Sequence, residues 1–254
     1  MKTLKSFDLT GRKAFITGGA KGIGRSAALA FAEAGADVAI VDMDTESAET
    51  TVKEVKALGV RSVYVKADIT DPYDVDRMME KILAEFKTVD IAFNNAGICV
   101  NEKAEVMSYE NWKRVIDVNL NGVFLTARAA GRVMIKNRKG CIINTASMSG
   151  HVVNVPQPQS AYNASKAGVI LLTKSLAVEW APYNVRVNCI SPGYIGTKMT
   201  LSATQWIPAW EALTPVKRMG RPEELTAALV YLAGDGASFT TGSDIVIDGA
   251  YSCV

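Results

Sequence analysis

Short apolar runs and longer amphipathic segments alternate along the whole chain. The apolar runs have the length and composition of buried strands, at residues 13–17, 37–41, 61–66, 89–93, 141–146, 185–190 and 244–247. Between them apolar residues recur at helical spacing, and helices are expected up to residue 34, at 45–58, from 71, at 112–136, around 162 and at 222–232. Such alternation predicts an α/β fold with a parallel sheet of about seven strands, right-handed crossovers and helices on both faces.

Local sequence signals mark the ends of the first three helices. Gly35 follows the first helical pattern, and glycine is common where a helix ends because it has no Cβ. Thr45 is predicted to cap the second helix, and Asp71 to begin the third.

The pattern indicates a single domain. No long linker, internal repeat or low-complexity stretch interrupts it, and a chain of 254 residues with 48% apolar residues can bury one large core. We therefore expect residues 1–254 to form one domain around a doubly wound, Rossmann-type sheet.

Composition excludes several classes of function. The formal net charge is +2 and the basic residues are scattered among almost as many acidic ones, so nucleic acid is not an expected partner. The four cysteines are far apart and His151 is the single histidine, so no metal site is expected. The amino-terminal residues lack an apolar signal core and no apolar run has the length of a membrane span, so we expect a cytoplasmic protein without membrane association.

A glycine-rich stretch joins the first predicted strand to the first helix. Gly18, Gly22 and Gly24 have the spacing Gly-x-x-x-Gly-x-Gly, with Ile23 between the last two. Missing side chains at such a place let the backbone approach a pyrophosphate at the positive amino end of a helix. The stretch predicts a dinucleotide site, although a glycine-rich turn by itself is also compatible with a simple turn.

Residues near the end of the second strand bear on which dinucleotide would bind. Asp42 lies where a carboxylate accepts hydrogen bonds from the adenosine ribose and repels a 2′-phosphate, which favours NAD over NADP. Lys21, inside the glycine stretch, could instead pair with a 2′-phosphate, serve the pyrophosphate or be solvated. Because Met43 and not an arginine follows Asp42, we expect NAD.

A serine, a tyrosine and a lysine supply the candidate acid–base chemistry. Tyr162 and Lys166 are four residues apart in a helical segment, so both fall on one face, and the ammonium is expected to lower the pKa of the phenol. Ser147 follows an apolar run and is expected at the carboxyl end of a strand, where open α/β sheets bind ligands. The alternative for the tyrosine and lysine is an ordinary pair on a helix surface.

Together these motifs resemble the short-chain dehydrogenase/reductase family over essentially the whole chain. The matching pieces are Thr17-Gly18-x-x-x-Gly22-Ile23-Gly24, Asn94-Asn95-Ala96-Gly97, Val118-Asn119-Leu120, Ser147, Tyr162-x-x-x-Lys166 and Pro192-Gly193. The resemblance implies an NAD(P)-dependent oxidoreductase in which Tyr162 is the acid and base and Lys166 holds the nicotinamide ribose. It also implies that Ser147 orients the reacting oxygen, that Asn119 supports a water-linked proton relay, and that the protein is a homotetramer.

The same resemblance implies further cofactor contacts. Asp68, followed by Ile69, is similar to a family aspartate beside the adenine, although it could also belong to a turn and helix cap. Small residues after the fourth strand would pass under the adenosine ribose, and residues after the sixth strand would meet the nicotinamide carboxamide. The residues concerned are Asn95, Ala96, Gly97, Pro192, Gly193, Ile195 and Thr197.

The substrate is indicated by a polar loop and a predicted lid. The loop at residues 148–160 is similar to members that oxidise sugar alcohols or reduce ketoses, and Ser149, Asn154 and Gln157 are expected to bind substrate beside Ser147 and Tyr162. The same loop is also compatible with a solvated segment. Residues 194–215 resemble a lid over the active site, in which Trp206 and Trp210 could face either substrate or another subunit.

Our expectation is therefore an NAD-dependent oxidoreductase acting on a sugar alcohol or ketose. One alternative is a 3-oxoacyl-[acyl-carrier-protein] reductase, for which the basic residues at 128–139 could form a docking surface. They are equally expected as favourable charges at a helix carboxyl end. A second alternative is a non-catalytic NAD-binding sensor, which the four filled catalytic positions disfavour.

Overall fold

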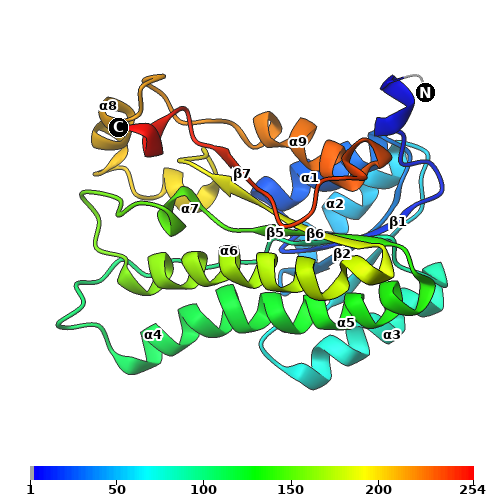
Figure 1. Cartoon of the computed structure of the whole chain (residues 1–254). Helices are drawn as coiled ribbons and strands as arrows, with labels where there is room; N and C mark the ends of the chain where they lie inside the picture. The colour runs from blue at the N-terminus through cyan, green and yellow to red at the C-terminus, as the bar shows by residue number, and fades with distance from the viewer. Residues whose placement is uncertain (1–2) are drawn as a thin grey trace.

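Seven parallel strands form one sheet at the centre of the molecule in the computed structural model, which describes residues 3–254. Their spatial order is β3-β2-β1-β4-β5-β6-β7 (Figure 1). The strands are β1 (Lys13–Thr17), β2 (Asp37–Asp42), β3 (Ser62–Lys66), β4 (Ile91–Asn94), β5 (Gly140–Thr145), β6 (Val185–Pro192) and β7 (Asp244–Ile247). The predicted sheet is confirmed, with strand ends shifted by one or two residues.

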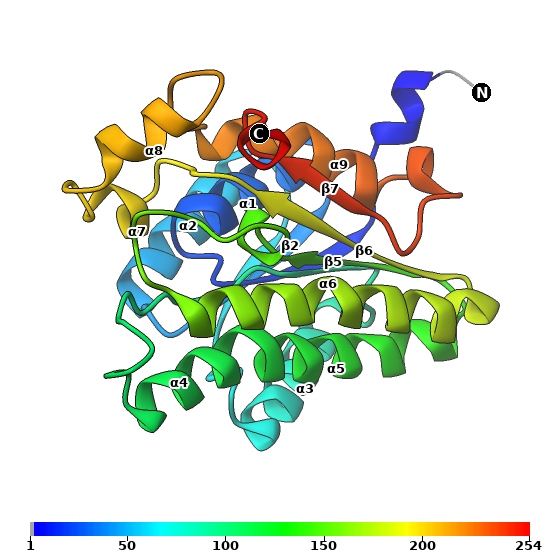
Figure 2. The same ribbon diagram turned by 60° about the vertical axis from the view of Figure 1, so that its left-hand side comes forward.

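Helices cover both faces of this sheet, as predicted. Figure 1 and Figure 2 show α3, α4, α5 and α6 on one face and α1, α2 and α9 on the other. The helices are α1 (Gly22–Glu33), α2 (Thr45–Ala57), α3 (Pro72–Phe86), α4 (Tyr109–Ile116), α5 (Gly122–Asn137), α6 (Ser160–Trp180), α7 (Lys198–Leu201), α8 (Ile207–Leu213) and α9 (Thr226–Ala233).

The strands are apolar along their whole length because both faces are buried. In β1, Ala14 and Ile16 pack in the core beneath α1 and α9, whereas Phe15 packs in the core beneath α3 and α5. Successive strand residues point to opposite faces, so neighbouring residues of one strand contribute to two cores.

Two local features differ from the sequence prediction. The amino-terminal cap of α2 is Asp44, whose side chain accepts a hydrogen bond from the backbone N–H of Ser47, so the prediction that Thr45 caps this helix was wrong by one residue. The long helix predicted at 112–136 begins at Tyr109 and contains a π-helical turn, Asp117–Asn121, between α4 and α5. A π turn inserts an extra residue in the helix, and such turns are frequent at functional sites.

The strand order reverses between β1 and β4, which determines where a ligand can enter. Connections from the two strands run to opposite faces of the sheet at such a point and leave a crevice outside the carboxyl ends. Figure 2 shows α7 and α8 beyond the end of the sheet to which the β6 arrow points. The predicted lid at residues 194–215 therefore lies over the carboxyl ends of the strands.

The apolar face of α6 belongs to the core of this chain. Val169 and Leu176 are buried and Leu172 packs against them, while Leu171 and Val178 are exposed on the outer surface of the same helix. Exposed apolar residues are compatible with a subunit interface. The homotetramer stays a prediction. Among residues 3–254 no helix is both long enough and apolar enough to cross a membrane.

A buried polar chain joins β4, β5 and α6, and its removal is expected to destabilise the fold. Asn94 Nδ2 donates to Asn144 Oδ1 at 2.9 Å, and Asn144 Nδ2 donates to Thr173 Oγ1 at 2.9 Å. Asn144→Ala would leave the two partners without these bonds, and we expect the free energy of unfolding to fall by about 2–3 kcal/mol. Urea denaturation followed by circular dichroism measures this loss.

Asn137→Ala provides the matched control. Asn137 is exposed and bonds to Thr88 Oγ1 at 3.1 Å on the surface. The control should change the free energy of unfolding by no more than about 0.5 kcal/mol. Equal losses for the two variants would contradict the importance of the buried chain.

Candidate active site

The glycine loop between β1 and α1 has a shape that side chains would prevent. Gly18 and Gly22 have φ angles of +62° and +53°, a region that residues with a Cβ rarely adopt. A Cβ on Gly24 would lie 2.1 Å from the Gly18 carbonyl oxygen. The loop therefore needs glycine at these positions and brings bare backbone to the amino end of α1.

A cavity opens in front of this loop, and most predicted cofactor residues line it. It extends from the loop to the side chains of Tyr162 and Lys166, which come from α6. Thr145, Lys198 and Met199 also line it, although the sequence did not single them out. The predicted residues in the lining are Gly18, Lys21, Gly22, Ile23, Asn95, Ala96, Gly97, Tyr162, Lys166 and Thr197.

These residues fit a bound dinucleotide. The amino end of α1 offers backbone N–H groups and the positive end of a helix dipole to a pyrophosphate. Lys166 donates one hydrogen bond, from Nζ to the Thr145 carbonyl at 2.7 Å, and an ammonium has three donors, so two are available to hydroxyl groups in the cavity. The cavity thus offers groups suited to the phosphates at one end and to a ribose at the other.

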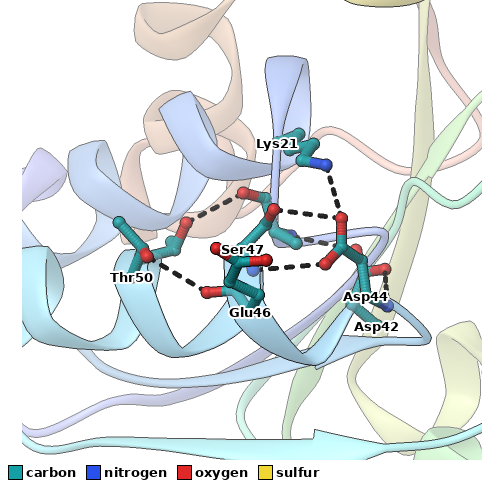
Figure 3. Close-up of polar contacts among 8 residues, drawn as sticks. Lys21, Asp42, Asp44, Glu46, Ser47 and Thr50 are labelled. Atoms are coloured by element: carbon teal, nitrogen blue, oxygen red, sulfur yellow. Dashed lines mark hydrogen bonds and ion pairs between the residues drawn. The ribbon is translucent and has the colours of Figure 1, made fainter.

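The carboxylate of Asp42, at the end of β2, bonds to backbone N–H groups beside the glycine loop (Figure 3). Its Oδ2 accepts a hydrogen bond from the backbone N–H of Ala20 at 3.0 Å, and its Oδ1 accepts one from the backbone N–H of Asp44 at 3.0 Å. Each carboxylate oxygen can accept a second bond, so a ribose hydroxyl remains an acceptable partner. Lys21, for which three roles were open, is in an ion pair with Asp44.

Several predicted cofactor residues do not line the cavity. Asp68 Oδ1 accepts hydrogen bonds from the backbone N–H and the hydroxyl of Thr70, so its side chain belongs to a turn, the alternative that the sequence left open. Ile69 is buried, and a Cβ placed on Gly122 would lie 2.7 Å from its Cδ1. The others are Gly24 within the loop, Asp42 at the end of β2, the exposed Met43, Pro192 at the end of β6, Gly193, which lines a second pocket, and the buried Ile195.

Tyr162 lies between the cofactor cavity and a second pocket, and it lines both. Burial raises the pKa of its phenol to about 12, and a hydrogen bond with Ser147 acts in the opposite direction. The prediction that Lys166 lowers this pKa was wrong for the protein alone. The ammonium lies 5.6 Å from the centroid of the phenol ring and is itself buried, so the loss of solvation outweighs its charge.

Ser147 lies where the sequence placed it, directly after β5. It caps a short 3-10 helix, Met148–Gly150, by accepting a hydrogen bond from the backbone N–H of Ser149 at 3.1 Å. This bond fixes the hydroxyl oxygen, and the hydroxyl proton remains available to a substrate oxygen or to Tyr162.

Asn119 lies in the π-helical turn, and its amide N–H groups and its carbonyl oxygen all bond to the protein. Its Oδ1 accepts from the backbone N–H of Ile98 at 2.8 Å, and its Nδ2 donates to the Ile98 carbonyl at 2.9 Å and to Ser165 Oγ at 3.1 Å. Ser165 in turn donates to the Tyr162 carbonyl at 2.7 Å. The side chain therefore joins the segment after β4 to α6, and its part in a proton relay stays a prediction.

The second pocket adjoins the cofactor cavity on the far side of Tyr162. Of the predicted substrate residues, Ser147, Ser149, Gln157 and Tyr162 line it, and Asn154 does not. The remaining lining residues are Cys99, Asn101, Met148, Gln159, Gly193, Tyr194, Met199, Thr200, Ala203 and Trp210.

The amides of the polar loop are buried, so the alternative of a solvated segment does not hold for them. Gln159 Nε2 lies 2.8 Å from Asn163 Oδ1, 3.2 Å from Ser149 Oγ and 3.3 Å from Asn154 Oδ1, three acceptors that share its two N–H groups. Gln157 Nε2 donates to Gln159 Oε1 at 3.2 Å and to the Tyr194 hydroxyl at 2.8 Å. Asn154 belongs to the same network, because its Nδ2 donates to the Tyr194 hydroxyl at 3.3 Å.

One of the two tryptophans of the predicted lid contributes to the pocket. Trp210 is buried, its Nε1 donates to Gln157 Oε1 at 2.8 Å, and its ring stacks on Tyr194 with centroids 4.3 Å apart. Trp206 is half-buried and lies 6.1 Å from Trp210 between ring centroids. The sequence analysis did not name Tyr194 as a site residue. Its position directly after Pro192-Gly193 was the signal that could have identified it.

Comparison with known proteins agrees with this geometry. A family model described as enoyl-(acyl carrier protein) reductase matches residues 18–252. The chain is 43% identical to "Sorbose reductase SOU1" of Candida albicans, over 98% of this chain and 90% of that protein. It is 42% identical to a "Probable NADP-dependent mannitol dehydrogenase" of Yarrowia lipolytica, over 98% of this chain and 91% of that protein.

A solved structure extends the similarity to three dimensions. It is described as a short-chain type dehydrogenase/reductase from Mycobacterium marinum, with a TM-score of 0.98 and 45% identity over 100% of both chains. Similarity of this extent, together with a phenol that lines two adjoining pockets, one shared with a serine and the other with an ammonium, leads to one conclusion. This chain belongs to the short-chain dehydrogenase/reductase family and is an NAD(P)-dependent alcohol dehydrogenase or ketoreductase.

Proposed function

We propose that this enzyme transfers a hydride between NAD and a secondary alcohol or ketone of a sugar alcohol or ketose. The observation that carries the proposal is the position of Tyr162 on the wall shared by the cofactor cavity and a polar pocket. The names of the relatives, a sorbose reductase and a mannitol dehydrogenase, support the same substrate class.

The chain's own groups manage the proton of the reacting hydroxyl. When bound, the nicotinamide would supply the hydride acceptor for a carbinol carbon, or the hydride donor for a carbonyl carbon in the reverse direction. In reduction, the neutral phenol of Tyr162 gives its proton to the substrate oxygen and becomes a phenolate; in oxidation, that phenolate takes the proton as the O–H bond of the substrate breaks. The neutral phenol must therefore lose its own proton to solvent before each oxidation. Ser147 donates to the same oxygen and stabilises the negative charge that develops there in reduction.

Lys166 and Asn119 position these groups. The ammonium of Lys166 is fixed by the Thr145 carbonyl and directs its other donors into the cofactor cavity. Asn119 bonds to both backbone groups of Ile98 and, through Ser165, to the turn of α6 that carries Tyr162. This arrangement keeps the phenol at a fixed place relative to the cavity.

The polarity of the second pocket supports a hydroxyl-rich substrate. Ser149 Oγ accepts a hydrogen bond from Gln159 Nε2, which leaves its own proton free to donate. Ser149 and Asn101 both line this pocket and carry groups that can bond to hydroxyl groups of a substrate. A substrate with several hydroxyl groups can satisfy such groups, whereas an apolar one would leave them unpaired.

The assignment of NAD rests on Asp42. A carboxylate at the end of β2 accepts hydrogen bonds from ribose hydroxyls and repels a 2′-phosphate. The mannitol dehydrogenase of Yarrowia lipolytica is named as NADP-dependent, so the assignment of NAD to this chain is tested by titration with both cofactors.

Three of the basic residues at 128–139 that could dock an acyl carrier protein already have partners within the chain. Arg132 pairs with Asp76, and Arg138 donates to the Pro182 carbonyl at 3.0 Å. Arg128 lies over the ring of Phe124, 5.6 Å from its centroid. These contacts favour structural roles for the three arginines.

The first prediction tests the activity. The protein should reduce NAD with mannitol, sorbitol or galactitol and oxidise NADH with sorbose or fructose, with a much lower kcat/KM for cyclohexanol and acetoacetyl thioesters. Absorbance of the reduced nicotinamide follows both directions. Tight NAD binding with no turnover on any of these compounds would favour the sensor instead.

The second prediction concerns the phenol. Tyr162→Phe should lower kcat by about a hundredfold to ten-thousandfold, because only the proton donor and acceptor is lost. Calorimetric titration should show NAD binding close to that of the wild type. A variant that retains its turnover would contradict the mechanism.

The third prediction concerns cofactor choice. Asp42→Ala should weaken NAD binding about tenfold through loss of charged hydrogen bonds, and it should strengthen NADP binding because the repulsion is gone. Fluorescence titration with each cofactor measures the ratio. An unchanged ratio would make Lys21 the better guide to specificity.

The fourth prediction uses the buried ammonium. Burial lowers the pKa of Lys166 from the model-peptide value of 10.5 to about 8. Between these two values the unfolded chain binds one more proton than the folded protein, so this group makes the free energy of unfolding rise with pH, by at most about 1.4 kcal/mol per pH unit. Below the lower value the amine is charged in both states and the dependence disappears.

Lys166→Met isolates this effect. The difference in free energy of unfolding between wild type and variant, measured by urea denaturation without cofactor, should shift in favour of the wild type between about pH 8 and pH 10. A difference that does not change with pH would show that the pKa of Lys166 is unperturbed.

A further inference from the structure

A cation and a carboxylate face each other at the rim of the cofactor cavity. Lys21 belongs to the glycine loop and lines the cavity. Its Nζ forms an ion pair with Oδ2 of Asp44, which lies two residues beyond the end of β2 (Figure 3). The two side chains are 51% and 40% exposed, so the ion pair is not enclosed by the fold, and of the two residues Lys21 lines the cavity.

Asp44 is held in place by more than the lysine. Its Oδ1 accepts from the backbone N–H of Ser47 at 3.2 Å, and its Oδ2 accepts from Ser47 Oγ at 3.0 Å. Its own backbone N–H donates to Asp42 at 3.0 Å. The carboxylate therefore caps α2 and cannot turn away without breaking the cap.

The fixed position of the Asp44 carboxylate determines the partner of Lys21. Lys21 has a long flexible side chain, whereas the Asp44 carboxylate is held by its bonds to Ser47. The ammonium therefore adopts the position that pairs it with this carboxylate. The hydrogen bond from Lys21 is the largest cause that lowers the pKa of Asp44 to about 2, so the carboxylate stays charged throughout the neutral range. Without Asp44, the same ammonium would be a donor for a 2′-phosphate at this rim.

We propose that Asp44 is a cofactor-specificity residue, which keeps Lys21 in an ion pair and so denies NADP the cation that the glycine loop carries. The inference rests on the proposed preference for NAD. It explains how a lysine in the loop is compatible with that preference. Asp42 and Asp44 then act by different routes: Asp42 faces the ribose, whereas Asp44 acts through Lys21.

Asp44→Asn is the variant that separates charge from structure. Asparagine is as good an amino-terminal cap as aspartate, so its Oδ1 can keep the bond to the Ser47 N–H while the charge that holds Lys21 is removed. Dissociation constants for NAD and NADP are measured by calorimetry on wild type, Asp44→Asn, Lys21→Met and the double variant. Circular dichroism verifies that each variant keeps the helix content of the wild type.

The expected result is a coupling between positions 21 and 44. In Asp44→Asn the dissociation constant for NADP should fall about fivefold or more, and that for NAD should change less than about twofold. In the Lys21→Met background the same substitution should change NADP binding less than about twofold, because no cation is left to release.

Glu46→Gln is the matched control. Glu46 lies in the first turn of α2, carries the same charge, and has no ion pair with Lys21 in the described chain 3–254. Its removal should change NADP binding less than about twofold. An effect as large as that of Asp44→Asn would reduce the result to general electrostatics and overturn the proposal.

Two further outcomes would also overturn it. If Asp44→Asn leaves NADP binding unchanged, the ion pair does not limit access to the lysine. If the substitution strengthens NADP binding equally with and without Lys21, the carboxylate repels the phosphate directly. Wild-type protein that binds NADP more tightly than NAD would contradict the proposed cofactor, and the coupling between the two positions would still be read from the four variants.

Discussion

Backbone groups at the carboxyl ends of the strands lose their sheet partners, and the site is built from the side chains that replace those partners. Asn95 Nδ2 donates to the carbonyls of Thr17 and Gly18 where β1 ends. Lys166 donates to the carbonyl of Thr145 where β5 ends. Buried polar backbone must be paired, so these bonds are required by the fold before any ligand is considered. Residues that satisfy the strand ends are thereby placed beside the cavity.

Burial, more than proximity of charges, sets the acid–base properties of this site. Burial favours the neutral form of each side chain, so the pKa of the Tyr162 phenol rises to about 12 and the pKa of the Lys166 amine falls to about 8. Removing water penalises the phenolate and the ammonium alike, and their separation is too large for each to compensate the other. The same low dielectric strengthens the electrostatic effect of any charge that a cofactor brings into the cavity. The pKa values of Tyr162 and Lys166 therefore depend on whether a cofactor is bound.

The substrate pocket gains its shape from amides that bond to one another. Gln157 connects the loop after β5 to two aromatic residues of the lid segment, because Tyr194 accepts from its Nε2 and Trp210 donates to its Oε1. Two rings stacked 4.3 Å apart and a glutamine bonded to both form a rigid wall. Fully satisfied polar networks of this kind are rigid, so specificity does not depend on loose surface groups.

The sequence by itself determined the order of strands and helices, because apolar periodicity and glycine positions are local properties. It also found Gly18, Asp42, Ser147, Tyr162 and Lys166, whose neighbours along the chain already indicate a strand end or a helix face. Only the tertiary structure decided which distant groups meet there. The pairing of Lys21 with Asp44, the pKa of Tyr162, and the burial of Gln157, Gln159 and Trp210 all depend on segments 20 or more residues apart, and no local pattern encodes a contact or a loss of solvent across such separations.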